Sequence, residues 1–181
     1  MKWSTVATTG LFFAWLGHDA EEFFTMQETS RKIMADLPTG LPVPPEWRQS
    51  GLPQRHLAVG MSTMGLLMAA ASADGYRTGG RSAFYQNVLL GFGLHGIGHV
   101  GLAVALRGYA SGVATSPTIV IPFWLGATRY LNAKGVPARR SVLAAALSIP
   151  ASIWVSHGIA YALTRRRACG PDLKDVDGRG C

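Results

Sequence analysis

Residues 6–26 read VATTGLFFAWLGHDAEEFFTM, an apolar run of about the length that spans a bilayer, interrupted by a histidine and several carboxylates. Ionisable side chains are costly inside a membrane and mark a functional site by default. On a helix, His18, Glu21 and Glu22 are spaced i, i+3 and i+4 and share one side of a turn, whereas Asp19 is expected to point elsewhere. We therefore expect His18, Glu21 and Glu22 to be catalytic and metal-binding. The alternative is that they hydrogen-bond neighbouring helices as structural contacts.

The composition indicates a membrane protein. Of the 181 residues, 48% are hydrophobic and only 15% are charged, and 22 are glycines. Ordinary soluble domains contain about 25% charged residues, and glycine is favoured in membrane helices. Because the apolar residues also come in long blocks, the expected fold class is all-α, an integral membrane bundle of about five transmembrane helices.

The bundle is expected to occupy residues 1–163, followed by a disordered basic and polar tail at 164–181. The proline-rich segment 27–55 is expected to be a long loop with at most a short turn at 30–37. It is a candidate lid, or an interfacial loop anchored by Trp47. The helices are expected at residues 3–26, 56–72, 84–106, 113–131 and 141–163.

A second polar signal lies in the third expected helix. His95 and His99 are spaced i, i+4 and share a helix face, which suits two imidazoles on one cation. His157 in the last expected helix and His56 at the start of the second are further metal-ligand candidates. For these two, a structural role is an equal alternative.

The glycines around those histidines match a nucleotide-binding pattern by spacing alone. In GFGLHGIGHVG (residues 91–101), three glycines fit G-x-G-x-x-G, but that motif requires a preceding strand, and here it lies inside an apolar helix. The five glycines are better explained as a thin helix face against which other helices pack closely.

The net charge of +7 does not indicate nucleic-acid binding. The basic residues lie between or after the apolar blocks, where they anchor helix ends at lipid headgroups, and they form no patch interleaved with aromatics. The expected partner is the lipid bilayer, with no nucleic acid. The balance of basic residues on the two sides of a five-helix topology slightly favours a cytoplasmic C-terminus. Cys169 and Cys181 have no metal-type spacing.

The order of these motifs resembles the HXXEE-domain family of bacterial membrane proteins. His18, Glu21 and Glu22 match the family motif, and the resemblance extends to His95 and His99 and to the segments Arg-Gly-Tyr (107–109) and Thr-Ser-Pro (115–117). It covers residues 11–163. The resemblance implies a multi-helix protein of the bacterial cell membrane, and it supports the choice of residues without supplying a reaction.

Two mechanisms suit these residues. His18, Glu21, Glu22, His95 and His99 together resemble sets that bind iron or manganese in helix bundles, so one expectation is a metal-dependent oxidoreductase acting on an apolar, lipid- or terpenoid-like small-molecule substrate. The other is a metal-free cyclase or isomerase that uses Glu21 or Glu22 as the acid. A third function is a non-enzymatic, proton-coupled transporter or membrane assembly partner, with which a homodimer is compatible.

Overall fold

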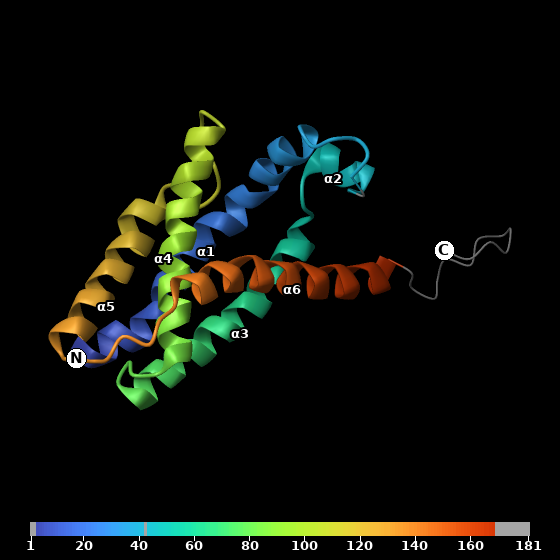
Figure 1. The fold of residues 1–181 in the computed structure, drawn as a ribbon. Coiled ribbons are helices and arrows are strands. Elements are labelled where there is room, and N and C mark those ends of the chain that lie inside the picture. Colours follow the sequence, from blue (N-terminus) through green and yellow to red (C-terminus); the bar gives the residue numbers. More distant parts are fainter. Residues whose placement is uncertain (1–2, 42, 169–181) are drawn as a thin grey trace, which may run out of the picture.

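The computed structural model describes residues 3–41 and 43–168, and all regular secondary structure in these ranges is helical (Figure 1). The all-α class is therefore confirmed. The expected disorder of residues 169–181 concerns a segment outside the described residues, whereas residues 164–168 continue the last helix. The elements are α1 (Trp3–Ala35), α2 (Pro45–Ser50), α3 (Gln54–Thr78), α4 (Ala83–Ala105), the π-helical turn η1 (Ser116–Val120), α5 (Ile121–Ala133) and α6 (Val142–Ala168).

Within residues 3–41 and 43–168, three helices are long and apolar enough to cross a membrane, which supports a membrane protein. They are α3, α4 and the part of α6 up to Thr164. The helix α5 has 13 residues and is about 20 Å long, short of the roughly 30 Å of a bilayer core. The helix α1 has 33 residues, but the His18–Glu22 region dilutes its apolar character. Five membrane crossings therefore remain a prediction for α1 and α5.

The expectation of a long loop at residues 27–55 is wrong. The helix α1 continues to Ala35 because no proline occurs before Pro38, and Arg31 donates to both oxygens of Glu28, at 2.7 and 2.6 Å, on its outer face. Within the remaining segment, α2 forms a short helix. Its Arg48 donates hydrogen bonds to four backbone carbonyls between residues 34 and 41, which holds α2 against the end of α1.

The end of the second expected helix also lies further along the chain. Asp74 and Gly75 do not terminate α3, which continues to Thr78 and ends at Gly79 with φ of +59°, a left-handed conformation that glycine adopts readily. Gly75 is instead needed inside the helix, because a Cβ atom there would clash with the ring of Tyr85.

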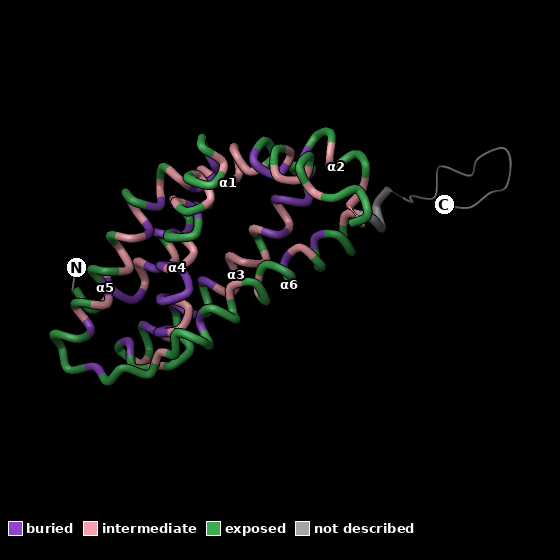
Figure 2. Tube along the Cα trace, turned by 45° about the horizontal axis from the view of Figure 1, so that its top comes forward, coloured by how far each residue is buried: buried purple, intermediate pink, exposed green. Residues whose placement is uncertain are grey.

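The helices enclose one core in which α1 is central. The helix α1 packs against α3, α5 and η1, and α3 and α4 both pack against α6. Buried positions concentrate where α1, α3 and α4 face one another (Figure 2). Tyr85 of α4 is fully buried there, and its hydroxyl donates to the backbone carbonyl of Ala7. The core includes Leu11, Trp15, Ala71, Phe92 and Val120.

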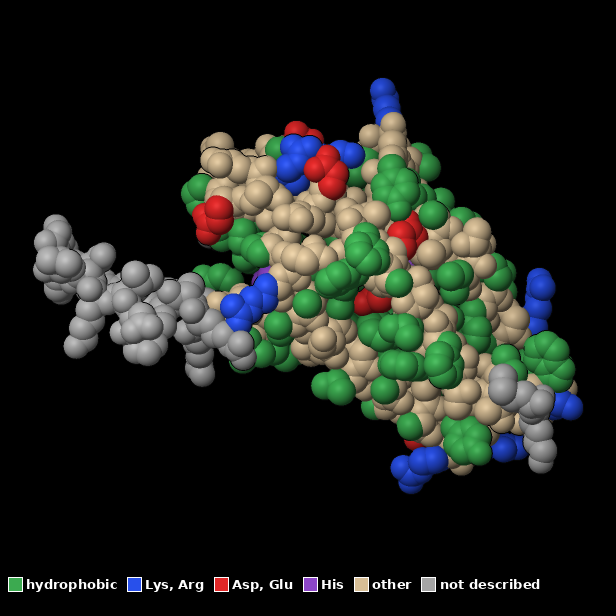
Figure 3. Space-filling view, turned by 180° about the vertical axis from the view of Figure 1, so that it is seen from behind, with side chains coloured by type: hydrophobic (Ala, Val, Ile, Leu, Met, Phe, Trp, Pro, Cys, Tyr) green, Lys and Arg blue, Asp and Glu red, His purple; other side chains and the backbone are tan. Residues whose placement is uncertain are grey.

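The outer surface has the distribution expected of a membrane protein. Large hydrophobic side chains such as Trp154, Leu147 and Phe24 are exposed. In Figure 3, hydrophobic side chains are spread over the middle of the face and the basic side chains lie at its edges. Lipid tails can cover such a surface, and lysine and arginine at its edges can reach the headgroups.

The glycines of α4 divide into two groups. A Cβ at Gly93 would clash with the indole of Trp124, and a Cβ at Gly96 would lie 2.7 Å from Val120 Cγ1, so both allow close approach of η1 and α5. At Gly98 and Gly101 nothing lies within 4 Å of such a Cβ. The interpretation as a close-packing face is confirmed for Gly93 and Gly96 and wrong for Gly98 and Gly101.

This division predicts opposite effects of one substitution at two sites. Gly93→Ala should lower the free energy of unfolding by about 1–3 kcal/mol, because Trp124 must move. Gly98→Ala should leave it unchanged or raise it by up to about 1 kcal/mol, because alanine is the better helix former and the site is open. Thermal unfolding of the two variants in detergent measures the difference. Equal melting temperatures would contradict the packing described.

Candidate metal centre

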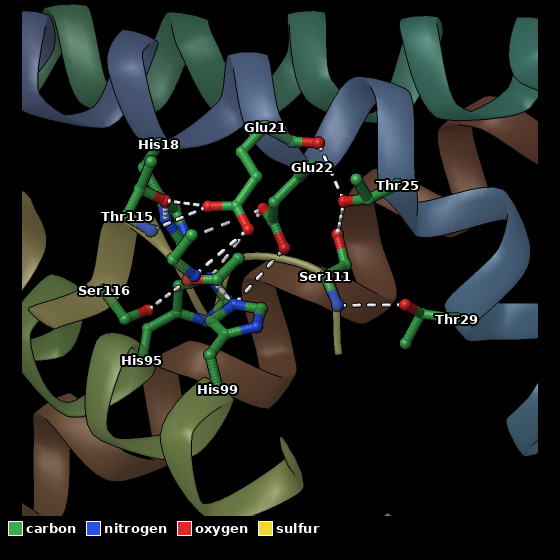
Figure 4. Close-up of polar contacts among 12 residues, drawn as sticks. His18, Glu21, Glu22, Thr25, Thr29, His95, His99, Ser111, Thr115 and Ser116 are labelled. Carbon is green, nitrogen blue, oxygen red and sulfur yellow. Dashed lines mark hydrogen bonds and ion pairs between the residues drawn. The ribbon is translucent and has the colours of Figure 1, made fainter. Parts of the chain in front are cut away.

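Four side chains from two helices converge at the centre of the bundle (Figure 4). His18 and Glu22 come from α1, and His95 and His99 come from α4. Each offers one ligand atom, and these atoms all lie within 4.8 Å of one another. Both pairs are spaced i, i+4, so each helix presents its two side chains on one face. The expectation that these two helices bring their polar clusters together is confirmed.

The distances within this cluster suit a common cation. Glu22 Oε1 lies 3.2 Å from His99 Nε2, and Glu22 Oε2 lies 3.8 Å from His18 Nε2 and 4.0 Å from His95 Nε2. The Nε2 atoms of His95 and His99 are 2.8 Å apart. Ligand atoms that each lie about 2.1 Å from one metal are roughly 3–4 Å from one another. The four residues therefore need only small adjustments to coordinate one ion.

The cluster is buried and leaves polar atoms unpaired. His18 is 0% exposed and Glu22 is 5% exposed. His18 Nε2 and Glu22 Oε1 are both buried without a hydrogen-bond partner. Unpaired buried polar atoms are costly and uncommon in native proteins. A cation bound among these atoms would satisfy them, and the donors, three imidazole nitrogens and one carboxylate with no thiolate, suit iron, manganese or zinc.

A hydrogen-bond chain sets the tautomer of His18. Thr115 Oγ1 donates to Glu21 Oε2 at 2.5 Å and lies 2.7 Å from His18 Nδ1. Because a hydroxyl has one hydrogen and Glu21 accepts it, Thr115 Oγ1 must accept a hydrogen bond from His18 Nδ1–H. The proton is then on Nδ1, and His18 Nε2 presents its lone pair to the cluster. A metal-binding histidine typically has such a partner on its other nitrogen.

Glu21 is a partner of the surrounding loop rather than a member of the cluster. Its carboxylate accepts hydrogen bonds from the backbone N–H groups of Thr115, at 2.7 Å, and Ala114, at 3.1 Å, and from the Tyr109 hydroxyl. Burial, and then the hydrogen bond to Glu21, raise the pKa of Tyr109, so its hydroxyl remains a donor. Adjacent helix positions point about 100° apart, which separates Glu21 from Glu22.

The segment 106–115 covers the cluster, and the prediction of the site from the sequence did not include it. Gly112 has φ of +78°, and a Cβ there would lie 2.7 Å from His18 Cε1 and 2.8 Å from His99 Nδ1. Only glycine fits this position without displacing an imidazole. The Ser111 N–H donates to Thr29 Oγ1 at 2.9 Å, which fixes the segment to α1. The Arg-Gly-Tyr motif at 107–109 lies inside this segment and the Thr-Ser-Pro motif begins at its last residue, so these two motifs were the sequence signal that could have indicated the covering segment.

An apolar cavity adjoins the cluster. Its volume is about 730 Å³, and its wall includes Glu22, His95 and His99 together with side chains of α1, α3 and α6. Asp19 also lines it, so the expectation that Asp19 points elsewhere is wrong. The reason is that Asp19 and Glu22 are spaced i, i+3, which places their side chains on the same side of α1. Asp19 lies beside Glu22, and its Oδ2 is buried without a hydrogen-bond partner.

The remaining two candidate ligands lie apart from the cluster, and of these two His157 lines the cavity. His56 Nε2 and His157 Nδ1 are 2.8 Å apart and hydrogen-bond to each other. Among the described residues, the potential metal-binding group contains His18, Glu22, His95 and His99 but neither His56 nor His157. The structure therefore brings four of the seven predicted ligands together and places Glu21 beside them.

The fold and this site define an all-helical membrane protein with a buried histidine and glutamate cluster. A family model described as a protein of unknown function with HXXEE motif matches residues 9–127, more than half of the chain. The chain belongs to the HXXEE family. The matched part includes all four residues of the cluster and the segment that covers it. No curated protein and no solved structure matches.

Removal of the Thr115 hydroxyl tests the hydrogen-bond chain. Thr115→Val keeps the side-chain shape but leaves His18 Nδ1 without an acceptor, so metal affinity should fall by about 10–100-fold. Thr115→Ser should retain affinity. Thr118→Val is the matched control, because the exposed Thr118 hydroxyl bonds only to the Ala114 carbonyl. Titration of iron(II) or manganese(II) into chelator-treated protein measures the change, and equal affinity in the Thr115→Val and Thr118→Val proteins would refute the chain.

Proposed function

We propose that this protein is a membrane enzyme that uses one iron or manganese ion to oxidise an apolar, lipid- or terpenoid-like substrate. The observation that supports the proposal most directly is a preformed ligand set, three of whose four residues line the wall of a large apolar cavity. His18, Glu22, His95 and His99 would hold the ion. When bound, the ion would supply the redox chemistry, with a diffusible oxidant such as dioxygen accepting the electrons.

A single ion is favoured over two. The described residues contain one group of potential ligands at this site, and Glu21 is engaged by donors of the covering segment. Four protein ligands leave one or two positions of a five- or six-coordinate iron or manganese ion open for reactants. The chain's own residues then have distinct tasks. Thr115 and Glu21 orient His18, and Glu22 supplies the negative charge that partly neutralises the cation.

The cavity supports an apolar substrate. Its volume of about 730 Å³ lies within the range of small-molecule binding sites, roughly 300–1,000 Å³. Its wall contains Met61, Met64 and Met68, whose flexible side chains adapt to irregular hydrocarbon shapes. A second, shallower groove between α1 and α3 shares Trp15, Asp19 and Met61 with this cavity. These side chains separate the groove from the cavity, so movement of the flexible Met61 side chain would open a route from the bilayer to the cavity.

A metal-free cyclase or isomerase is the second candidate function. Glu22 rather than Glu21 is then the acid, because Glu22 lines the cavity whereas the Glu21 carboxylate accepts four hydrogen bonds. The neighbouring carboxyl of Asp19 favours this candidate, since two adjacent carboxyls can share a proton. A non-enzymatic transporter or assembly partner ranks third, because the sequence shows no internal repeat of the kind many carriers have.

The proposed location is the bacterial cell membrane, with several membrane crossings and a cytoplasmic C-terminus. The family resemblance supports the bacterial membrane. The distribution of basic residues between the helices supports the orientation. A homodimer is compatible with this location.

Metal analysis of the detergent-purified protein tests the proposed function. We expect close to one equivalent of iron or manganese by mass spectrometry, and strong loss of the metal in His99→Ala and Glu22→Gln. Two matched controls should keep the metal. Glu28→Gln changes an exposed glutamate of the same helix, and His157→Ala removes a histidine outside the cluster.

Three outcomes would separate the alternatives. Metal-free protein that turns over an apolar substrate would replace the metal mechanism with the acid mechanism. Equal metal loss in the control variants would show that bound metal reflects folding rather than this cluster. Full metal content in both His99→Ala and Glu22→Gln would place the metal elsewhere and overturn the assignment.

A further inference from the structure

A second polar feature, separate from the metal cluster, reaches the cavity wall through His157. It consists of His56 near the start of α3 and His157 of α6, whose rings stack at 5.1 Å between centroids with an interplanar angle of 20°. His56 is 2% exposed, while His157 is half-buried and lines the cavity. Trp47 of α2 packs edge-on against His56 at 5.0 Å between centroids. The histidine pair is therefore held in place from three helices.

The hydrogen bond between the two rings leaves one nitrogen of each unpaired. His56 Nδ1 is buried with no hydrogen-bond partner, and no side chain or backbone group among the described residues hydrogen-bonds to His157 Nε2. If His56 Nε2–H donates, then His157 carries its proton on Nε2 and can donate to a ligand. If His157 Nδ1–H donates, its Nε2 can accept instead. The pair can therefore bind an oxygen that donates, accepts or does both.

The helix ends place His56 of this pair near the membrane surface. His56 is in the first turn of α3, next to Arg55, and Trp47 covers it. Arginine and tryptophan at the end of a spanning helix are typical of headgroup depth. His18, by contrast, lies in the middle of α1. The wall of one apolar cavity thus contains His157 of this pair and, apart from it, three residues of the metal cluster.

We propose that His157, positioned by His56, binds the terminal hydroxyl or carboxyl group of a single-chain amphiphile whose hydrocarbon chain fills the cavity. This deepens the proposed function, because it identifies the substrate class and places the chain of the substrate toward the metal cluster. A second metal site is not supported, since only two histidines meet here and each is bonded to the other. The shared chemistry of the ligand is a terminal oxygen at the end of an alkyl chain.

The test uses photoreactive alkyl probes on full-length protein in lipid nanodiscs. Three probes carry a diazirine at the far end of a hexadecyl chain and differ at the other end, which is a hydroxyl, a carboxyl or a methyl group. We expect the hydroxyl or the carboxyl probe to label the wild-type protein about tenfold more than the methyl probe, a preference that corresponds to about one good hydrogen bond. Labelled peptides should come from the part of α4 around His95 and His99.

Variants of His157 show whether the preference comes from the histidine pair. His157→Leu should remove the preference for the oxygen-containing probes while leaving labelling by the methyl probe unchanged. His157→Gln should restore part of it, because an amide can donate and accept. Thr164→Val is the control on the same helix, since its hydroxyl bonds to the Ala160 carbonyl. A preference for hydroxyl over carboxyl, or the reverse, identifies which of the two groups is bound.

The outcome of the labelling experiment can be distinguished from the outcome of the metal analysis. Metal content is measured in the same samples and should be unchanged in His157→Leu. A wild-type protein without metal that still prefers the oxygen-containing probes would overturn the metal mechanism but keep this proposal. Equal labelling by all three probes in the wild type, or an undiminished preference in His157→Leu, would overturn the proposal.

Discussion

The carboxylate of Glu21 is the contact that connects the first helix to the segment covering the site. It accepts hydrogen bonds from two backbone amides and two side-chain hydroxyls of residues 109–115. Charge-assisted hydrogen bonds of this kind are about twice as strong as neutral ones. In a bundle surrounded by lipid they also satisfy backbone groups that have no water to bind. The position of Gly112 against the imidazoles, and of Thr115 against His18, both depend on this contact.

The same contact determines the chemistry available to the cluster. With Thr115 fixed by Glu21, His18 must carry its proton on Nδ1 and present Nε2 inward. Nearby, Glu22 supplies a carboxylate between three imidazoles. Two adjacent glutamates thus have different roles. One organises the loop and orients a ligand, and the other is the proposed ligand itself.

The cavity has polar groups at two separate parts of an otherwise mainly apolar wall. At one part of its wall Glu22, His95 and His99 of the cluster provide a reactive centre, and at another His157, hydrogen-bonded to His56, provides a hydrogen-bonding group. The surface between them is mainly apolar, from methionine, leucine and aromatic side chains. A cavity of this kind complements a molecule with one polar end and a long hydrocarbon chain. The exposed apolar faces of α6 and α1 place the cavity within reach of membrane lipids.

The amino-acid sequence was enough to predict the all-α class and a set of seven candidate ligands that contains the four cluster residues. Long apolar blocks without strand periodicity predict helices. Ionisable residues at i, i+4 within such blocks are too costly to be unpaired, so His18 and Glu22 could be matched with His95 and His99 from spacing and hydropathy alone. Helix ends were less predictable, because α1 continues through a polar segment, residues 27–35, that no proline interrupts. The packing of the helices was needed to distinguish Glu21 from Glu22, because their roles depend on Thr115 and Gly112, which are distant in sequence. Asp19 lies on the same side of α1 as Glu22, as its i, i+3 spacing already implies, but only the packing of the helices showed that both carboxyls line one cavity, because the other walls come from helices distant in sequence.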